Sequence, residues 1–392
     1  MKILVICQNY YPEQFRITDI CEELVKRGNE VAVVTGLPNY PEGKIFNGYR
    51  HGKKRDEVIN GVKVHRCFTV GRKHGIIFRF LNYYSFAISS KKYAKKIKED
   101  FDIVLVNQLS PVMMANAGIA YKKKHKKKLV LYCLDLWPES LIVGGIKRNS
   151  IIYKHYYKVS EKIYKQCDKI LVTSKCFSDY FKEEFGIENT AYLPQYAEDL
   201  FSAEDCRKTP DENLDLMFAG NIGAAQSVET IIGAAKLTQD IPNLRWHIVG
   251  DGSELENIKK SAEGLNNVYF YGRQPLEKMP EFYAKSDAML VTLKKDPVLS
   301  YTLPGKVQTY MAAGKPIVGA IDGETKRIIE EADCGICSAS EDVESLVENL
   351  KTFIRQGGLA DKSENAINFY NKNFTKDSFF EKLNTSFEEI IG

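Results

Sequence analysis

A lysine and a hydroxyl side chain three positions apart predict a phosphate site late in the chain. Lys306 and Thr309 lie in residues 301–316, a stretch with proline and glycine near both ends. This pattern predicts a loop followed by a short helix that ends before a new segment begins. Free backbone N–H groups at the start of such a helix, together with the Lys306 cation, would face a bound anion. Thr309 would project from the same face and reach a neighbouring ribose. The same spacing also suits an ordinary amphipathic helix.

A glycine-containing turn at residues 218–223 offers a second phosphate site. Gly220 and Gly223 follow a strand-like apolar run and precede a helical pattern. Glycine permits a tight turn whose amides, assisted by the positive end of the next helix, would face a diphosphate. Turns of this kind also occur for structural reasons alone.

Charge is divided unevenly along the 392 residues. The first 200 residues contain 34 Lys and Arg against 21 Asp and Glu, and the remaining 192 contain 21 against 30. A chain of this length suits two domains, so we expect a basic first domain and an acidic second one. The basic domain would meet an anionic membrane surface or a lipid diphosphate. Nucleic acid is not expected as a partner, because no recognition helix, zinc spacing or RNA-binding signature accompanies the charge.

The cysteines and the hydropathy pattern bear on location. Nine cysteines are scattered through apolar segments, and the first residues run directly into a strand-like segment, which predicts reduced thiols and a cytoplasmic protein. Cys334 and Cys337 form one pair with no second pair at zinc spacing, so we expect buried thiols and no metal site. No uncharged apolar run approaches the roughly 20 residues of a membrane span, so membrane contact would be peripheral.

Strand-like apolar runs alternate with helical patterns in both halves of the chain. They cover residues 3–6, 31–34, 103–106, 129–133 and 170–173, then 214–219, 245–249, 268–271, 288–293 and 316–320. This rhythm predicts an α/β fold with two doubly wound, Rossmann-like domains and a cleft between them. Residues 193–213 have the composition of a linker. We therefore place a first Rossmann-like domain at 1–197, a second at 198–373 and a terminal amphipathic helix at 374–392.

The order of several motifs makes the chain similar to a known family. Residues 301–316 resemble the donor-site helix of the retaining family 4 glycosyltransferases with the GT-B fold, and the likeness extends over nearly the whole chain. The other motifs lie at residues 10–13, 37–41, 135–140, 193–197, 218–223 and 249–252. The subgroup that adds amino sugars during O-antigen and capsule assembly is the most similar. In this family the terminal helix packs back on the N-terminal domain.

The resemblance implies where a nucleotide-sugar donor, most simply a UDP-sugar, would bind. Its diphosphate would meet Lys306, as a catalytic residue, and the backbone around Gly220, Asn221 and Gly223. Further donor contacts would come from Arg273, Tyr301, Thr302, Leu303, Pro304 and Gly305.

Two departures from the family pattern affect this donor site. Asn221 and Gln226 stand where many relatives have an arginine and a lysine, which leaves charge neutralisation mainly to Lys306 and backbone amides. Thr309 replaces a ribose-binding glutamate. Glu324 is a possible substitute, although it equally suits a plain helix start.

The resemblance also places the acceptor on the first domain. Asp135 follows a strand-like run, at the carboxyl edge where open α/β sheets bind ligands, and would orient a hydroxyl as the second catalytic residue. The other acceptor-binding residues would be Glu13, Arg16, Trp137 and Glu139. Helix capping by Asp135, core packing by Trp137 and a surface position for Arg16 remain open.

Basic residues are concentrated in two segments of the first domain. They interleave with aromatic residues in 71–84, and six lysines occupy seven positions in 122–128. Each Lys or Arg near an anionic leaflet contributes about 1 kcal/mol, so these segments predict peripheral attachment to the inner face of the plasma membrane. A solvated helix face is the alternative.

These features predict a retaining glycosyltransferase without metal or cofactor. It would move an N-acetylated amino sugar from a UDP-sugar to a polyprenyl-diphosphate-linked saccharide. No side-chain base is needed, because the donor's own phosphate can take the acceptor proton while Lys306 and amides stabilise the leaving diphosphate. A UDP-sugar 2-epimerase of the same architecture and a catalytically weak, membrane-bound scaffold of polysaccharide assembly are the alternatives.

Overall fold

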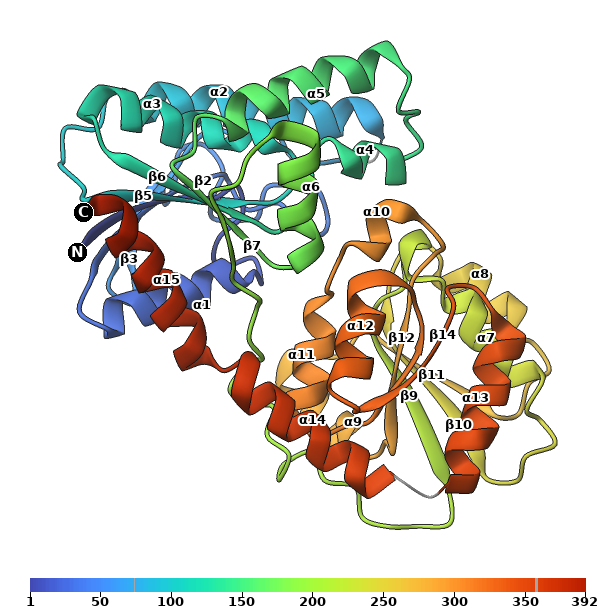
Figure 1. Cartoon of the computed structure of the whole chain (residues 1–392). Helices are drawn as coiled ribbons and strands as arrows, with labels where there is room; N and C mark the ends of the chain where they lie inside the picture. Colours follow the sequence, from blue (N-terminus) through green and yellow to red (C-terminus); the bar gives the residue numbers. More distant parts are fainter. Residues whose placement is uncertain (74, 357–358) are drawn as a thin grey trace. The chain divides into compact units, whose positions relative to one another are not determined.

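The computed structural model describes residues 1–73, 75–356 and 359–392 and divides the chain into two compact units (Figure 1). The first unit comprises Met1–Thr173, Phe177–Leu193 and Leu383–Gly392. The second comprises Ser174–Cys176 and Pro194–Lys382. Each unit is therefore built from segments that are separate in sequence.

A sheet forms the centre of the first unit. Its strands are β1 Lys2–Ile6, β2 Glu30–Thr35, β3 Asp56–Ile59, β4 Val62–Arg66, β5 Ile103–Gln108, β6 Lys128–Cys133, β7 Lys169–Val172 and β8 Thr190–Tyr192. In space they follow the order β3-β4-β2-β1-β5-β6-β7-β8. All neighbouring pairs are parallel except β3 and β4, which are antiparallel. Strands such as β5, with every residue buried, are covered on both faces, as parallel sheets require.

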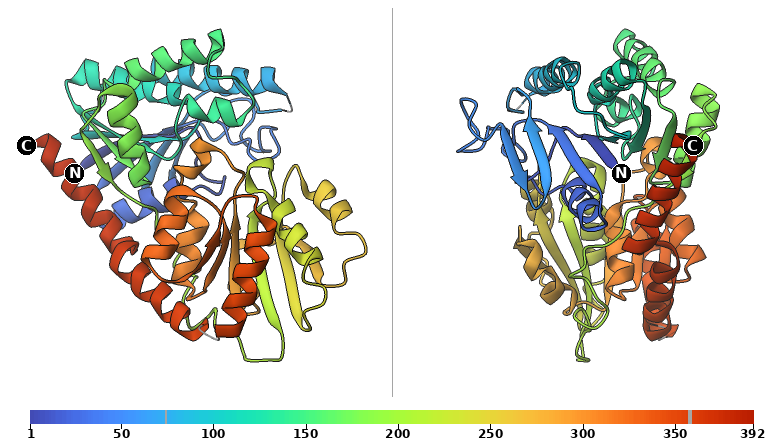
Figure 2. Two further views of the ribbon diagram at one scale, coloured as in Figure 1. Left: turned by 45° about the vertical axis from the view of Figure 1, so that its right-hand side comes forward. Right: turned by 90° about the vertical axis from the view of Figure 1, so that its left-hand side faces the viewer.

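Helices cover both faces of this sheet. They are α1 Arg16–Lys26, α2 Ile76–Ala94, α3 Asn116–His125, α4 Glu139–Val143, α5 Ile151–Tyr164 and α6 Lys175–Phe185. Helices α2, α3 and α5 lie over one face and α1 lies over the other (Figures 1 and 2). In α1 the buried side chains recur at helical spacing, at Ile17, Ile20, Cys21 and Leu24, so one stripe of the helix faces the sheet.

The second unit has a fully parallel sheet. Its strands are β9 Leu214–Asn221, β10 Leu244–Asp251, β11 Val268–Gly272, β12 Ala288–Thr292, β13 Ile317–Ala320 and β14 Gly335–Ser338. In space they follow the order β11-β10-β9-β12-β13-β14. The helices are α7 Val228–Lys236, α8 Leu255–Ser261, α9 Met279–Tyr283, α10 Pro297–Ser300, α11 Gly305–Ala312, α12 Gly323–Glu331, α13 Val343–Gln356 and α14 Leu359–Asn373.

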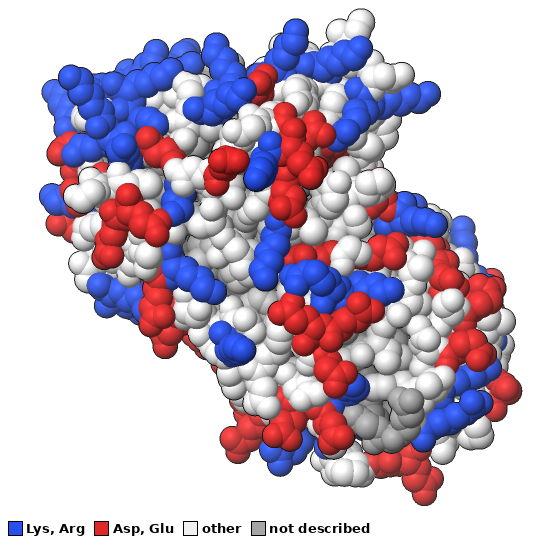
Figure 3. All heavy atoms as spheres, viewed as in Figure 1, with Lys and Arg blue, Asp and Glu red and all other residues white. Residues whose placement is uncertain are grey.

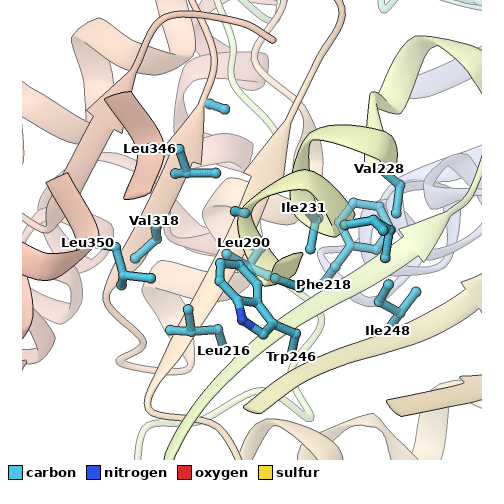
Figure 4. Close-up of a cluster of buried hydrophobic side chains, with 14 of the residues drawn as sticks. Leu216, Phe218, Val228, Ile231, Trp246, Ile248, Leu290, Val318, Leu346 and Leu350 are labelled. Carbon is cyan, nitrogen blue, oxygen red and sulfur yellow. The ribbon is translucent and has the colours of Figure 1, made fainter. Parts of the chain in front are cut away.

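A hydrophobic core joins this sheet to two of its helices. Leu216, Phe218 and Trp246 project from the sheet against Ile231 of α7 and Leu346 of α13, and all five are buried (Figure 4). Burial of large apolar side chains is the main favourable term in folding, and a fully buried aromatic ring contributes about 1.5–3 kcal/mol. The core thereby fixes β9 and β10, whose carboxyl ends carry the motifs at residues 218–223 and 249–252.

A charged cluster lies at the amino end of the second sheet, where β9 and β10 begin. The buried Asp215 carboxylate accepts hydrogen bonds from Lys208 at 2.8 Å, Arg245 at 2.6 Å and His247 at 2.7 Å. Burial alone would raise the pKa of Asp215, but these three partners hold the pKa below its usual value.

Strand order reverses between β1 and β5 in the first sheet and between β9 and β12 in the second. In doubly wound sheets the carboxyl ends of the strands at such a reversal form the ligand-binding edge. Both units therefore have one edge at which a ligand site is expected.

The α/β fold predicted from the strand rhythm is confirmed, with two Rossmann-like units. Each predicted strand is present, with ends shifted by one or two residues. The prediction missed β3, β4, β8 and β14, which are at most five residues long, and the helix α14. Residues 193–213 contain no helix or strand, and all of them are described.

The terminal helix α15, Lys376–Ile391, spans the division between the units. It begins after Thr375, whose hydroxyl accepts the Ser378 N–H at 3.2 Å, as expected for an N-cap. Its last residues belong to the first unit, where Glu389 pairs with Lys169 and Phe387 is fully buried.

Candidate functional site

The first unit has a cavity of about 370 Å³ at the carboxyl ends of its central strands. Its walls include Asn9 after β1, Tyr40 after β2, Ser110 after β5 and Asp135 after β6. The cavity thus lies at the reversal of strand order, where a doubly wound sheet binds ligands.

Asp135 is held in the wall of this cavity by two serines. Its carboxylate accepts hydrogen bonds from Ser110 and, at 2.8 Å, from Ser140. Burial raises the pKa of Asp135, and the serine hydrogen bonds oppose that rise. The arrangement gives the cavity a fixed acceptor for a hydroxyl group of a ligand. The expectation that Asp135 lies at the ligand-binding edge matches its position here.

Aromatic rings form much of the remaining wall, including Phe15, Tyr40, Phe80, Tyr83 and Trp137. Trp137 is 2% exposed, and its ring meets Tyr83 edge-on at a centroid distance of 6.3 Å. Trp137 therefore packs in the core, the alternative that the sequence left open, and also lines the cavity; its contact with a sugar stays a prediction. Aromatic faces of this kind suit a sugar ring.

Glu13 lies behind the cavity rather than in its wall. One carboxylate oxygen accepts the backbone N–H groups of Asn39 at 2.8 Å and Tyr40 at 2.7 Å, and the other accepts the Asn9 amide at 3.0 Å. Burial raises the pKa of Glu13, opposed by these hydrogen bonds. The expected direct contact with an acceptor is therefore replaced by the positioning of Asn9 and Tyr40.

Glu139 and Arg16 also lie outside the cavity wall. Glu139 is fully buried, and one of its oxygens accepts hydrogen bonds from Tyr153 at 2.6 Å, Arg148 at 2.8 Å and Tyr180 at 3.0 Å. It holds α4 against α5 and α6, so the structure does not present it to an acceptor as expected. Arg16 is half-buried at the first position of α1.

Two arginines in the cavity wall were assigned by the sequence to a membrane surface. Arg72 and Arg79 both line the cavity, and the Arg72 guanidinium lies 5.5 Å from the centre of the Tyr83 ring. Within the part of the chain that the structure describes, neither guanidinium pairs with a carboxylate. The alternation of basic and aromatic residues in 71–84 was the available signal, but it does not say which side chains face inward.

In the second unit, the end of β9 and the start of α11 come together around Lys306. A side chain at Gly220 would place its Cβ 2.9 Å from Lys306 Nζ, so the amine lies directly over the glycine. Nζ also donates to Gln226 Oε1 at 3.1 Å and lies 4.1 Å from the centre of the Phe218 ring. The two sequence motifs predicted to bind phosphate are thus adjacent in space.

Burial lowers the pKa of Lys306 to about 7. Among the described residues no carboxylate pairs with this amine. A buried cation without a counter-ion is unfavourable until an anion binds beside it. The position therefore suits an anionic ligand.

Close backbone contact explains the glycines of the neighbouring turns. Gly220 and Gly250 adopt φ values of 146° and 148°, and a Cβ at Gly250 would lie 1.8 Å from the Gly220 carbonyl oxygen. Asn221 is exposed, and its amide lies over Gly223. Glycine at these positions therefore lets Lys306 lie over the end of β9 and lets the ends of β9 and β10 approach each other closely.

The segment before α11 forms the loop that the sequence predicted. Residues 301–304 connect α10 to α11, which begins at Gly305 with Pro304 as its N-cap residue and is followed by Gly314 at φ 64°. Tyr301, Thr302, Pro304 and Gly305 are half-buried, and Leu303 is buried.

Thr309 is turned into the protein. It is 7% exposed, and its hydroxyl donates to the Gly305 carbonyl at 3.2 Å and to Glu198 at 3.5 Å. This geometry favours a packing role over the expected ribose contact. This contact between Thr309 and Glu198 was not predicted from the sequence. The only hint of it in the sequence was that Glu198 directly follows the motif at residues 193–197.

Glu324 and Arg273 complete the expected donor residues. Glu324 is buried in the first turn of α12, and its two oxygens accept two hydrogen bonds from Arg327, both at 2.9 Å. Burial raises the pKa of Glu324 and Arg327 lowers it, with a net lowering. The carboxylate is thus held in an ion pair at a helix start, the alternative that the sequence left open. Arg273 is exposed just after β11.

The lysines predicted to meet a membrane gather over α3 and its neighbours (Figure 3). Part of the run is paired within the protein, since Lys122 contacts Asp168 at 2.6 Å and Lys127 contacts Asp100 at 2.9 Å. In the described residues, Lys91 and Lys92 of α2 have no carboxylate partner. The basic surface is therefore smaller than the sequence count implies.

The described part of the chain covers residues 1–73, 75–356 and 359–392. In these residues no three His, Cys, Asp or Glu side chains are grouped so that they could hold a metal ion. None of the helices described there is long and apolar enough to cross a membrane.

Comparison with known proteins gives a family for each half of the chain. Residues 14–193 match the model of Glycosyltransferase Family 4, and residues 204–372 match the model of Glycosyl transferases group 1. WcaI of Escherichia coli strain K12, named as a colanic acid biosynthesis glycosyl transferase, is 26% identical over 380 residues, which cover 90% of this chain and 91% of WcaI.

Solved structures show the same fold. Sucrose-phosphate synthase from Thermosynechococcus elongatus has a TM-score of 0.74 at 13% identity, covering 99% of this chain and 98% of that one. HepE of Anabaena, solved in complex with UDP, has a TM-score of 0.72 at 14% identity, covering 99% of this chain and 100% of HepE. The two-unit architecture of this chain is thus that of the GT-B glycosyltransferases.

Proposed function

We propose that this chain, a glycosyltransferase with a family 4 domain and a group 1 domain, transfers a sugar from a UDP-sugar to a polyprenyl-diphosphate-linked saccharide in surface polysaccharide synthesis. The transferred sugar is an N-acetylated amino sugar, and its anomeric configuration is retained. The names of WcaI and of the UDP complex of HepE support the pathway and the nucleotide.

The observation that carries this proposal is the position of Lys306 over Gly220. A cation without a carboxylate partner among the described residues, glycine amides at the end of β9 and the first turn of α11 together make a site for a diphosphate. The helix N-terminus adds a partial positive charge. Arg273, the other cation expected at the donor site, is exposed just after β11.

Transfer at this site needs stabilisation of the leaving group more than a base. The bond from the anomeric carbon to UDP breaks, a bond to the acceptor hydroxyl oxygen forms, and the hydroxyl proton passes to the departing phosphate. Lys306 and the amides stabilise the negative charge on UDP as it develops. Asp135 orients the acceptor hydroxyl in the first unit. The reaction proceeds without a metal ion or a cofactor.

The first unit binds the acceptor at the inner face of the plasma membrane. Exposed apolar side chains on α2 and α5 support this proposal, among them Ile77 at 70%, Ile88 at 52% and Ile151 at 87% exposure. Tyr84 and Tyr156 join the two helices through their hydroxyls at 2.9 Å. Lysines beside an apolar surface favour peripheral binding to an anionic leaflet.

Calorimetric titration with UDP and a transfer assay test the function. UDP should bind the wild-type chain, and Lys306→Ala should reduce that affinity about 10- to 100-fold, the loss of a charged hydrogen bond of 1.5–3 kcal/mol. Exposed Lys260→Ala in the same unit is the matched control. Wild-type UDP affinity in Lys306→Ala, or epimerisation of the UDP-sugar without transfer, would contradict the proposal.

A further inference from the structure

The first-unit cavity combines three chemical features in one small space. It has two arginines without carboxylate partners among the described residues, Arg72 and Arg79, a carboxyl group fixed by two serines at Asp135, and aromatic walls. Arginine binds phosphate oxygens in a two-pronged geometry, and a carboxylate accepts hydrogen bonds from sugar hydroxyls. The set matches a ligand that carries both a phosphate group and a sugar ring.

The cavity volume limits how much of such a ligand fits. At about 370 Å³ it lies near the lower end of the range for ligand sites, roughly 300–1,000 Å³. This space accommodates one monosaccharide with its diphosphate, and any further sugar would lie outside the cavity. The arginines and Asp135 lie in the same cavity. A diphosphate bound by the arginines and a hydroxyl bound by Asp135 would therefore belong to adjacent parts of one ligand molecule.

Apolar side chains next to the cavity provide a surface for the lipid. Ile77, Phe78 and Leu81 are exposed and flank Arg79 on α2, while exposed Val143 lies between wall residues Leu141 and Gly144. A prenyl chain leaving a diphosphate bound at Arg79 would meet these side chains directly.

We infer that this cavity holds the acceptor head group, with the diphosphate on Arg72 and Arg79 and its first sugar on Asp135. The sugar that receives the transferred residue is then the one bonded directly to the diphosphate. This inference rests on the proposed function and deepens it. The enzyme adds the second sugar of a chain, so its acceptor must come from a reaction that transfers a sugar phosphate to a prenyl phosphate.

Binding of geranyl diphosphate to the full chain tests the arginine subsite. The titration is done with UDP at saturation so that the donor site is filled. Arg72→Gln and Arg79→Gln should each weaken binding at least about 10-fold, and the pair about 100-fold. Geranyl monophosphate and inorganic diphosphate should both bind more weakly than geranyl diphosphate. The double variant Lys53→Gln/Arg55→Gln, on an exposed loop outside the wall, removes the same charge and should bind as wild type.

Two results would contradict the binding of the diphosphate by Arg72 and Arg79. Unchanged geranyl diphosphate affinity in Arg72→Gln/Arg79→Gln, with UDP affinity intact, would show that the arginines do not hold the diphosphate. Competition by phosphatidylglycerol vesicles as strong as that by geranyl diphosphate would show a membrane contact instead. Should the glutamine pair unfold, Arg72→Lys/Arg79→Lys keeps the charge but loses the two-pronged geometry, and should still weaken binding several-fold.

A transfer assay tests which sugar reacts. In a panel of geranyl-diphosphate-linked monosaccharides, one should accept labelled sugar, and the octyl glycoside of that monosaccharide should have a KM at least about 100-fold higher. Equal use of the octyl glycoside, or preference for a diphosphate-linked disaccharide, would overturn the inference. Failure of the whole chain to bind UDP would instead refute the proposed function.

Discussion

The protonation state of Lys306 should control donor affinity near neutral pH. Burial lowers its pKa to about 7, so about half of the free protein carries the cation at pH 7. A bound diphosphate restores the pKa toward its ordinary value of 10.5, because an adjacent anion favours the charged amine. Binding must therefore take up a proton, and affinity must fall as pH rises through 7.

The magnitude follows from the fraction protonated. Between pH 7 and pH 8.5 the charged fraction of the free amine falls from about one half to about 3%, so UDP affinity should drop about 15-fold. Ionisation of the phosphate itself, with a second pKa near 6, is nearly complete over this range. Uptake should be about 0.5 proton per UDP at pH 7 and about 1 at pH 8.5.

Titration calorimetry at several pH values, in buffers of different ionisation enthalpy, measures affinity and proton uptake together. Lys306→Arg should bind UDP with no pH dependence over this range, because a guanidinium stays charged. Lys306→Ala should be weak and equally independent of pH. A wild-type affinity that is constant from pH 7 to 8.5, with no proton uptake, would refute the reasoning from burial.

Three further results are expected. Thr309→Glu should lower the free energy of unfolding by about 1–3 kcal/mol, because it buries a carboxylate beside Glu198. Scanning calorimetry measures this effect, with Thr309→Ser as the control. An unchanged Tm in Thr309→Glu would contradict the packing role of Thr309. Asp215→Asn should cost about 1.5–3 kcal/mol in urea unfolding, because it removes charged hydrogen bonds to Lys208 and Arg245, although both cations keep Asp211 as a partner. The wild-type contribution, present above the unfolded pKa of about 3.9, should be lost as pH falls below that value. Equal urea midpoints of the two proteins at pH 6 would show that Asp215 does not stabilise the fold. The full chain should bind phosphatidylglycerol vesicles more tightly than phosphatidylcholine vesicles, and this affinity should fall between 0.1 and 1 M salt as the Debye length shrinks from about 10 to about 3 Å. Lys91→Gln/Lys92→Gln should weaken binding to the phosphatidylglycerol vesicles. Binding that does not depend on salt would indicate apolar contact alone.

The sequence was most informative where one-dimensional pattern determines structure. Parallel strands buried on both faces, such as β5, are continuous apolar runs and were predicted closely. The pair β3 and β4 was missed because alternate residues such as Glu57 and Lys63 are polar and each strand is short. The contact between the Gly220 turn and Lys306 was predicted only through the family resemblance, which places both motifs at one site. Local sequence patterns could not predict it, because 85 residues separate the two positions.

Side-chain direction and pairing explain the remaining differences at the site. Arg72 and Arg79 looked like surface charges because spacing does not show that both line a cavity. Glu13 and Glu139 looked like ligand contacts because their burial against backbone amides and tyrosines depends on segments far away in sequence. Lys122 and Lys127 looked unpaired because their partners Asp168 and Asp100 come from other elements.

The division of the chain into interleaved segments affects how the protein is made. Leu383–Gly392 belongs to the first unit, and Leu383 and Phe387 are buried, yet these residues follow the second unit in the sequence. The second unit, which ends at Lys382, is therefore synthesised in full before the first has all of its segments. A nascent or truncated chain that ends near residue 193 lacks these side chains, so its first unit is incomplete and should be prone to aggregation.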